Sequence, residues 1–460
     1  MKKIISAMAL SLLMGMASAT AQEIKPFVEG ERAAFLGNSI TDGGRYHSYI
    51  WLYYMTRFPN MPISVFNCGV GGDTAYDMYK RLDNDVFSKN PTVLMVTFGM
   101  NDSGYFEYNG DNAAEFGEQK YQECIENYKK MEQRLLQLPN TRIVALGTSP
   151  YDETAKIEGN LFKKKNETIK RIVAYQMEAA KRNGWEYLDM NAPMVALNAK
   201  GQEKDSTFTL CGSDRIHPDN DGHMVMAYLF LKAQGMAGKP VAKMEVNAGK
   251  KSVVNAENCT ISNIKKVGRS LTFDYKAESL PYPMDTVPRG WGQRHTQAMA
   301  ADVVPFYEEM NQELLKVTGL SGNYKLLIDG EDIGTWTGKQ LAEGINLAKE
   351  SKTPQYQQAL AVMHLNEMRM EIVQQMRVYA WCQHGFFQQQ GLLNANNRKA
   401  IEVMDANVDK NGWLKGNRDN YSRLMHDAVR EARLEQHQVL VDKIYEVNKP
   451  VTRKIELRKM

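Results

Sequence analysis

The feature that most constrains the fold is a repeated alternation of short apolar segments with longer amphipathic segments between residues 24 and 238. The apolar segments have the length of β-strands, and the amphipathic segments have apolar residues at α-helical spacing. Residues 92–98 are apolar nearly throughout, which is typical of a strand covered on both faces. Strands that alternate with helices favour a parallel sheet between two helical layers, so we expect a three-layer α/β/α fold.

This pattern also predicts where a ligand site lies. The expected strands are 33–36, 63–66, 92–98, 142–146 and 185–188, and the expected helices are 46–56, 119–138, 162–182 and 218–231. Pro218 would occupy the first turn of the last helix, where proline is well tolerated. In parallel sheets, ligands collect beyond the carboxyl ends of the strands. Polar residues that directly follow these strands are therefore the candidates for a site.

Residues 239–460 predict a mixed β and helical appendage packed on the first unit. The chain has 460 residues, which exceeds the usual size of a single core. We expect a β-rich segment at 239–290, a helix at 298–317, a hairpin of 324–329 and 332–337 with its turn at Gly330-Glu331, and long helices at 355–390, interrupted near Gly385, and 420–447. The aromatic residues of this region that lie close together are expected in its core; they are Tyr379, Trp381, Phe386 and Phe387.

Residues 1–21 have the pattern of a cleavable secretory signal. Lys2-Lys3 precede an apolar run at 4–16, and Ala19-Thr20-Ala21 offers a cleavage site of small residues. The run is too short to span a bilayer, and no later segment reaches that length. We therefore expect a periplasmic or secreted protein with no transmembrane segment.

The cysteines and charges limit the partners further. Five cysteines leave at least one unpaired in an oxidising compartment. Cys68 and Cys211 flank two of the chemical motifs described below, and they are either small buried apolar residues or a disulfide. The net charge is +3, and no basic tract alternates with aromatic residues, so we expect no nucleic-acid partner.

The first chemical motif is Gly37-Asn38-Ser39-Ile40-Thr41, directly after an expected strand. A Ser39 hydroxyl at this place would project from the sheet edge, beside helix-start amides that stabilise negative charge. The alternative is that Asn38 or Ser39 only caps the following helix. The motif is not Gly-x-Ser-x-Gly, so it does not indicate the nucleophile elbow of α/β-hydrolases.

Asp214 and His217 are candidates for the base that a serine nucleophile needs. At a spacing of three residues in a turn, the carboxylate can hold one imidazole nitrogen while the other faces Ser39. Alternatively, Asp214 caps the following helix and His217 lies on the surface. The other histidines considered for the base are expected to be structural; they are His47, His223 and His295.

Two further motifs offer donors for an oxyanion. The loop 69–72 contains three glycines, which allow close approach of a backbone N–H to a reacting oxygen. Asn101, in Gly99-Met100-Asn101-Asp102, offers a side-chain amide at the end of the next strand. Taken alone, each motif is also typical of an ordinary turn.

Together these motifs resemble the SGNH/GDSL hydrolase family. The resemblance covers residues 30–238 and implies Ser39 as nucleophile and N–H donor, Gly72 and Asn101 as further oxyanion donors, and Asp214 and His217 as the rest of the triad. Position 38 is Asn where the family usually has Asp, which removes a charge but not the nucleophile. The resemblance implies no metal or cofactor, and no histidine-carboxylate cluster has metal-ligand spacing.

The resulting expectation is a serine esterase that hydrolyses carboxylic esters, with acetyl esters on carbohydrates as the first choice. The alternatives are a lipase or thioesterase, and a non-catalytic glycan-binding protein on an esterase scaffold. Tyr46 and Tyr105 follow the first and third motifs, and we expect them at the rim of the site, with a sugar-binding role as the alternative.

Overall fold

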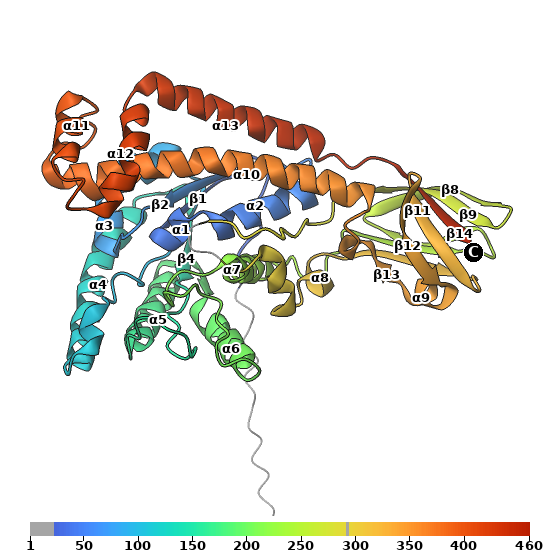
Figure 1. Cartoon of the computed structure of the whole chain (residues 1–460), viewed down its shortest axis with the longest axis horizontal. Helices are drawn as coiled ribbons and strands as arrows, with labels where there is room; N and C mark the ends of the chain where they lie inside the picture. The colour runs from blue at the N-terminus through green and yellow to red at the C-terminus, as the bar shows by residue number, and fades with distance from the viewer. Residues whose placement is uncertain (1–22, 291–293) are drawn as a thin grey trace, which may run out of the picture.

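The computed structural model of the chain describes residues 23–290 and 294–460, so the expected leader at 1–21 lies outside the described residues. The strands of the described part form three sheets, and most of the helices cover the first of them (Figure 1). In Figure 1 the other two sheets form a separate body at the end of the molecule that carries the C-terminus.

The first sheet is parallel throughout, with strand order β2-β1-β3-β4-β5. Its strands are β1 (Arg32–Gly37), β2 (Ser64–Gly69), β3 (Val93–Val96), β4 (Arg142–Gly147) and β5 (Glu186–Asp189). All four residues of β3 are buried, in agreement with the apolar run in the sequence. The three-layer α/β/α prediction is confirmed.

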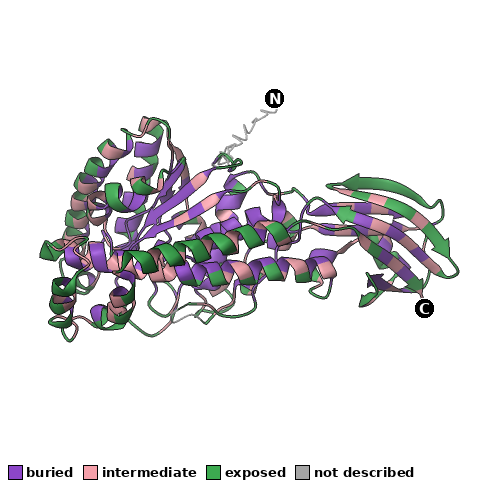
Figure 2. Cartoon of the chain, turned by 90° about the horizontal axis from the view of Figure 1, so that it is seen from above, coloured by how far each residue is buried: buried purple, intermediate pink, exposed green. Residues whose placement is uncertain are grey.

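Helices cover both faces of this sheet. They are α1 (Ser39–Asp42), α2 (Arg45–Arg57), α3 (Ala75–Lys80), α4 (Ala113–Leu135), α5 (Lys165–Asn183), α6 (Asn191–Gln202) and α7 (Asn220–Ala233). Alternate residues of β1 divide between two cores: Phe35 packs with α2 and α7, and Leu36 packs with α3 and α4. Figure 2 shows buried stretches along the strands of this sheet, beneath helices that are exposed on their outer sides.

The second body is a sandwich of a mixed and an antiparallel sheet. The mixed sheet has the order β13-β10-β6-β7 and consists of β6 (Ala242–Asn247), β7 (Ser252–Glu257), β10 (Glu313–Thr318) and β13 (Ile345–Asn346). The antiparallel sheet has the order β12-β11-β14-β9-β8 and consists of β8 (Cys259–Val267), β9 (Ser270–Ala277), β11 (Asn323–Ile328), β12 (Glu331–Thr337) and β14 (Arg453–Lys459). Buried residues of both sheets, such as Met244 and Phe273, share one core.

The remaining helices differ in position. They are α8 (Phe306–Glu309), α9 (Gly338–Glu343), α10 (Pro354–Trp381), α11 (Arg398–Asp405), α12 (Gly412–Leu424) and α13 (Asp427–Val447). Helix α9 packs on β10 and β12 of the second body, while α11 and α12 lie at the far end of the first unit in Figure 1. Helix α10 packs against α13 and α2, and both long helices lie across the top of the first unit in Figure 1. The expected appendage of β and helical elements is therefore confirmed, while its boundary at 238/239 stays a prediction.

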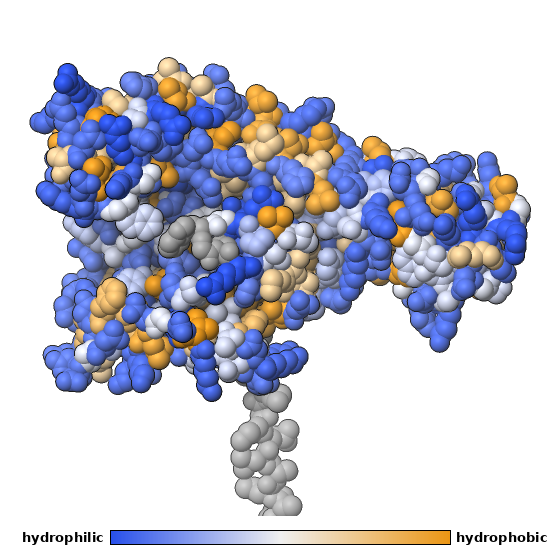
Figure 3. Space-filling model, in the orientation of Figure 1, coloured by the Kyte–Doolittle hydropathy of each residue, from blue (hydrophilic) through white to orange (hydrophobic). Residues whose placement is uncertain are grey.

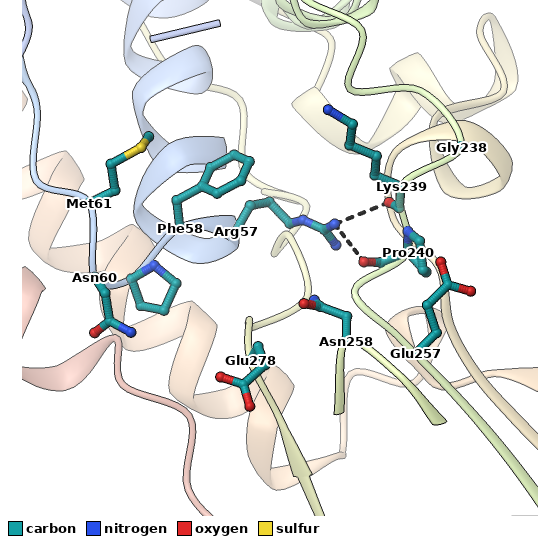
Figure 4. Close-up of a pocket in the computed structure, with 11 residues that line it drawn as sticks. Arg57, Phe58, Asn60, Met61, Gly238, Lys239, Pro240, Glu257, Asn258 and Glu278 are labelled. Atoms are coloured by element: carbon teal, nitrogen blue, oxygen red, sulfur yellow. Dashed lines mark hydrogen bonds between the residues drawn. The ribbon is translucent and has the colours of Figure 1, made fainter. Parts of the chain in front are cut away.

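Arg57, the last residue of α2, fixes the segment that joins the two bodies (Figure 4). Its Nη2 donates to the carbonyl oxygens of Lys239 and Pro240, at 3.0 and 2.6 Å. These contacts lie beside a cavity of about 640 Å³ that is also lined by residues of both bodies. Burial lowers the pKa of the Arg57 guanidinium.

Several predicted elements differ from the structure. The helix expected at 298–317 is wrong: this segment forms a 3₁₀ turn, the short α8 and strand β10, because β10 pairs with β6 and its alternating burial fits a sheet. The helix expected at 420–447 is broken between α12 and α13. Pro218 precedes α7 rather than entering it, since Asp219 caps the helix. The hairpin turn lies at Asp329-Gly330, whose φ angles of 52° and 91° suit a tight two-residue turn.

The predicted interruption near Gly385 is confirmed, because α10 ends at Trp381 and a π-turn follows at Cys382–Phe386. The aromatic residues of this region pack largely as expected, with Phe386 and Phe387 buried in a small core. Among the described residues, no helix has the length and apolarity needed to cross a bilayer.

Candidate active site

Ser39, His217 and Asp214 lie in one hydrogen-bonded line at the carboxyl end of β1. The Ser39 Oγ is 2.8 Å from His217 Nε2, and His217 Nδ1 is 2.6 Å from Asp214 Oδ2. The structure thus brings a hydroxyl, an imidazole and a carboxylate together from segments 178 residues apart. A nucleophile, a base and a group that orients the base have this arrangement in serine hydrolases.

Ser39 is not the residue that caps the following helix. Asn38 is the N-cap of α1, and its side-chain oxygen accepts the Ile40 N–H at 3.0 Å. Because Asn38 caps the helix, the Ser39 hydroxyl is available to His217.

The turn around Asp214 holds His217 in place. Asp214 Oδ1 accepts the backbone N–H groups of Ile216 and His217, at 2.9 and 3.0 Å. Burial raises the pKa of Asp214, but the hydrogen bonds from His217 and the backbone outweigh it and hold the pKa below its usual value. Asp214 therefore stays ionised beside the imidazole.

The same turn is anchored by Arg215. This buried residue has a φ of 66°, and its guanidinium donates to carbonyl oxygens of the segment at 152–157.

Gly72 and Asn101 lie on neighbouring loops that contact each other. Gly72 has a φ of 88°, which favours glycine. The Asn101 Nδ2 donates to the Asp73 carbonyl at 2.8 Å, and the Tyr105 hydroxyl donates to Asn101 Oδ1 at 2.5 Å. Asp102 also joins the two loops, because its carboxylate accepts the N–H groups of Ala75 and Gly99. The arrangement can present N–H donors from both loops to one oxygen.

Of the two tyrosines expected at the rim, Tyr46 lies elsewhere, while Tyr105 is half-buried beside Asn101 of the candidate site. Tyr46 is fully buried and hydrogen-bonds the Thr41 hydroxyl, so its assignment to the rim is wrong. Tyr105 contacts Asn101 directly, a role that sequence reasoning missed. The only signal in the sequence is that Tyr105 follows Asn101 by four residues, a spacing at which two side chains can meet on one helix or turn.

The other histidines considered for the base lie in different surroundings. Burial lowers the pKa of both His47 and His223 to about 3, so both are neutral near pH 7. His295 lies 2.9 Å from Asp221, and this hydrogen bond raises its pKa. Of the histidines in the described part of the chain, His217 is the one whose hydrogen bond to Ser39 is observed.

The cysteines at the site are free. All five cysteines are unpaired, and both Cys68 and Cys211 are buried. They are therefore small buried residues, and the disulfide alternative is wrong. Within the described residues, no group of three or more histidine, cysteine, aspartate or glutamate side chains is arranged to hold a metal ion.

Two cavities lie away from this hydrogen-bonded line. The cavity in Figure 4 and a second one of about 830 Å³ between β2, α10 and α13 are lined by residues other than the Ser39, His217 and Asp214 line. The hydrogen-bond geometry, rather than cavity size, locates the candidate site, because ester hydrolysis needs a base within reach of the nucleophile.

The fold and this constellation define a class of protein. The model of the GDSL-like lipase/acylhydrolase family matches residues 35–225, the range that contains every residue of the candidate site. The chain belongs to the SGNH/GDSL hydrolase family and is a carboxylic ester hydrolase.

Among solved structures, the chain is similar to a gut microbial diltiazem-metabolizing enzyme. The two are 72% identical, with a TM-score of 0.94, and the match covers 96% of this chain and 100% of that chain. The model of the diltiazem deacetylase C-terminal helical domain matches residues 360–449, which contain most of α10 and all of α11–α13.

More distant similarity covers less than half of the chain. An acetylxylan esterase from Geobacillus stearothermophilus is 26% identical over 224 residues, which are 45% of this chain and 94% of that protein. A crystal structure of an acetylxylan esterase from the same organism is 23% identical, with a TM-score of 0.36, and the match covers 45% of this chain and 95% of that chain.

Proposed function

We propose that the protein removes acetyl groups from oxygen esters through an acyl-Ser39 intermediate. The observation that carries the proposal is the 2.8 Å approach of Ser39 Oγ to His217 Nε2, with Asp214 on the opposite side of the imidazole. A serine hydroxyl becomes a competent nucleophile when a base accepts its proton in this geometry.

In the proposed mechanism, His217 takes the Ser39 proton as Oγ attacks the ester carbonyl. The oxyanion that forms is stabilised by the N–H groups of Ser39 and Gly72 and by the Asn101 side chain, and each such donor lowers the barrier by about 3 kcal/mol. His217 then gives the proton to the departing alcohol. A water molecule attacks the acetyl-Ser39 ester with His217 again as base, and acetate leaves. Asp214 keeps the imidazole oriented throughout.

An acetylated carbohydrate is the first proposed substrate class. Its support is the similarity of 45% of the chain to an acetylxylan esterase. The face shown in Figure 3 is mostly hydrophilic, with apolar residues in small scattered groups, which suits a hydrophilic substrate better than a lipid surface. We also propose that the protein acts outside the cytoplasm; the signal-like pattern of residues 1–21 supports this.

Diltiazem is the second candidate substrate. The support is the 72% identity, over 96% of the chain, to a diltiazem-metabolizing enzyme, together with the match of residues 360–449 to the helical domain of a diltiazem deacetylase. Both candidates share one reaction, transfer of an acetyl group from an alcohol oxygen to water.

Acetate release tests the proposal. The purified protein would be incubated with acetylated xylooligosaccharides, diltiazem and 4-nitrophenyl acetate, in parallel with Ser39→Ala and with the control Ser88→Ala, whose hydroxyl bonds the Asn84 carbonyl outside the site. Ser39→Ala should lose at least about 1000-fold in kcat while it stays folded, and Ser88→Ala should keep full activity. Wild-type turnover by Ser39→Ala would refute the nucleophile.

The alternatives give different results in the same assay. A lipase or thioesterase would prefer longer acyl chains in a series of 4-nitrophenyl esters. A glycan-binding protein without activity would bind the oligosaccharides and release acetate from none of the substrates.

A further inference from the structure

A side chain from the C-terminal half lies directly beneath the loop that carries Gly72. Arg377, on α10, is only 4% exposed, and its Nε donates to the Gly69 carbonyl at 2.8 Å. Its two terminal nitrogens donate to the two carboxylate oxygens of Asp85, at 2.8 and 2.7 Å. Gly69 is the last residue of β2 and begins the 69–74 loop. One guanidinium therefore joins α10, Asp85 and the start of this loop.

A second buried arginine extends the same network to the other end of the loop. Arg81 is bonded to Asp85 and to Asp73, each at 2.6 Å, and it donates to the Gly37 carbonyl at 3.0 Å. Gly37 is two residues before Ser39. Asp85 thus links the two arginines, and together they hold both ends of the 69–74 loop and the strand end that leads to the nucleophile. Burial raises the pKa of Asp85, but Arg377 and Arg81 outweigh it, so the carboxylate stays ionised.

Helix α10 also contacts the middle of the loop. The Trp381 Cδ1 atom lies 3.9 Å from the point where a Cβ atom on Gly71 would stand. On the other side, the Gly71 N–H donates to Asp42 Oδ2 at 3.0 Å, and Asp42 ends the helix that Ser39 begins. The loop is therefore enclosed between α1 and α10.

We propose that Arg377 is a positioning residue for ester hydrolysis, which fixes the 69–74 loop so that the Gly72 N–H meets the oxyanion. This rests on the proposed function. Donors of this kind act because they are set in place before the reaction, and displacement by about 1 Å can cost 100-fold in rate. The C-terminal helical region is then part of the active-site framework.

The chain offers a matched control on the same helix. Arg369 is 2% exposed, donates to the Asn366 side chain and lies over the Trp51 ring, with its Cζ 4.3 Å from the ring centroid. It has no observed bond to the 69–74 loop. Loss of either arginine removes a buried guanidinium from α10, but only Arg377 supports the loop.

The test compares Arg377→Lys with Arg369→Met on 4-nitrophenyl acetate. Lysine keeps the positive charge beside Asp85 but cannot make the three directed bonds. Arg377→Lys should lower kcat about 10- to 100-fold with KM within about twofold, and weaken inhibition by an alkylboronic acid, which mimics the tetrahedral intermediate, in parallel with kcat. Arg369→Met should keep kcat within about twofold at a comparable loss of Tm. If Arg377→Lys fails to fold, the uncharged pair Arg377→Met with Asp85→Asn takes its place.

Hydrogen exchange separates this proposal from the proposed function. Backbone amides of residues 69–74 should exchange faster in Arg377→Lys than in the wild type, and at the wild-type rate in Arg369→Met. An inactive wild-type protein would refute the proposed function, while the exchange rates would still test the support of the loop. Unchanged kcat and unchanged exchange in a folded Arg377 variant, or an equal loss of kcat in Arg369→Met, would overturn the proposal.

Discussion

The Asn101 side-chain amide is held at both of its ends. Its Nδ2 donates to the Asp73 carbonyl, and its Oδ1 accepts the Tyr105 hydroxyl. Lys165 Nζ lies 3.9 Å from the centre of the Tyr105 ring. It also donates to the carbonyl oxygens of Met100 and Gly104, in the same loop as Asn101. An asparagine amide has two N–H donors, so one remains for a substrate oxygen. We infer that Tyr105 orients this donor.

Tyr105→Phe is expected to lower kcat about fivefold with little change in KM. The substitution removes one hydrogen bond, worth about 1 kcal/mol, and leaves Asn101 free to rotate. The matched control is Tyr108→Phe. Tyr108 lies in the same segment as Tyr105, but its hydroxyl hydrogen-bonds the Ser103 carbonyl and the Thr168 hydroxyl rather than Asn101. Steady-state kinetics on 4-nitrophenyl acetate measure both; equal losses of kcat in the two variants would contradict the inference.

The buried carboxyl group of Glu313 is expected to make the free energy of unfolding depend on pH. This side chain is fully buried in β10, where one oxygen accepts bonds from Tyr275 and Gln355, and burial raises its pKa from 4.5 to about 7. The folded state therefore holds a proton that the unfolded state releases, so this stabilisation is fully present below pH 4.5 and is lost as the pH rises through 7. A difference of this size corresponds to about 3 kcal/mol.

Glu313→Gln should remove that loss, because glutamine keeps the hydrogen bonds and has no proton to release. Urea denaturation at several pH values between 5 and 8 measures the free energy of unfolding. The wild type should lose up to about 3 kcal/mol more than the variant over this range. Parallel curves for the two proteins would show that Glu313 does not titrate as inferred.

The residues of the candidate site differ in how far sequence could predict them. Asp214 and His217 are three residues apart, so their contact follows from local turn geometry. Ser39 follows a strand, and fold topology brings it to the same edge. Arg377, by contrast, contacts Asp85 across 292 residues. Nothing in its local sequence specifies which buried carboxylate a helical arginine meets.

At the scale of elements, β14 completes the antiparallel sheet from the end of the chain. It pairs with β11 on one side and β9 on the other, which makes it the central strand. Its alternating residues divide between faces: Ile455 and Leu457 are fully buried in the sandwich core, and Arg458 is exposed. The face of β14 with Ile455 and Leu457 is therefore expected to contribute most of what this strand adds to stability.

Leu457→Ala should destabilise the protein by about 3 kcal/mol, since it leaves a cavity in the sandwich core. Arg458→Ala, the next residue on the same strand, should change stability by less than about 0.5 kcal/mol, because its ion pair with Glu456 is exposed. Thermal unfolding followed by circular dichroism measures both. A similar small effect for the two variants would mean that this face is not packed as observed.

The elements of the first unit could be predicted because strand and helix periods alternate cleanly there. The segment 298–317 was predicted wrongly because its apolar residues fit a helical period as well as a strand. The pairing of β10 with β6, a contact with a distant strand, decided the outcome. Local periodicity contains no information about that partner.

At the scale of the molecule, α2 is the helix of the first unit that lies between α7 and the C-terminal helix α10. All 13 of its residues are buried, and it packs against both α7 and α10. Arg45 forms an ion pair with Glu367 of α10 at 2.7 Å, and Ser48 accepts a hydrogen bond from Asn366. The helical spacing of apolar residues in 46–56 predicts a helix with a buried face, but it identifies neither the burial on all sides nor the helix that covers the second face.

A fragment of residues 23–240 is therefore expected to be insoluble or inactive, although it contains every residue of the proposed triad and oxyanion hole. The cut exposes the α10-facing side of α2 and removes Arg377 from beneath the 69–74 loop. Expression of the fragment, size-exclusion chromatography and acetate release measure this. A soluble fragment with wild-type kcat would show that the division at 238/239 separates two independent domains.

The central position of β14 has a consequence for folding. The edges of β9 and β11 that face each other stay unpaired until β14 forms between them, and β14 follows α10–α13 in the chain. Pairing between segments so distant is slow, and open strand edges recruit other copies of a chain in the meantime. Recovery of native protein after dilution from denaturant should accordingly fall as protein concentration rises.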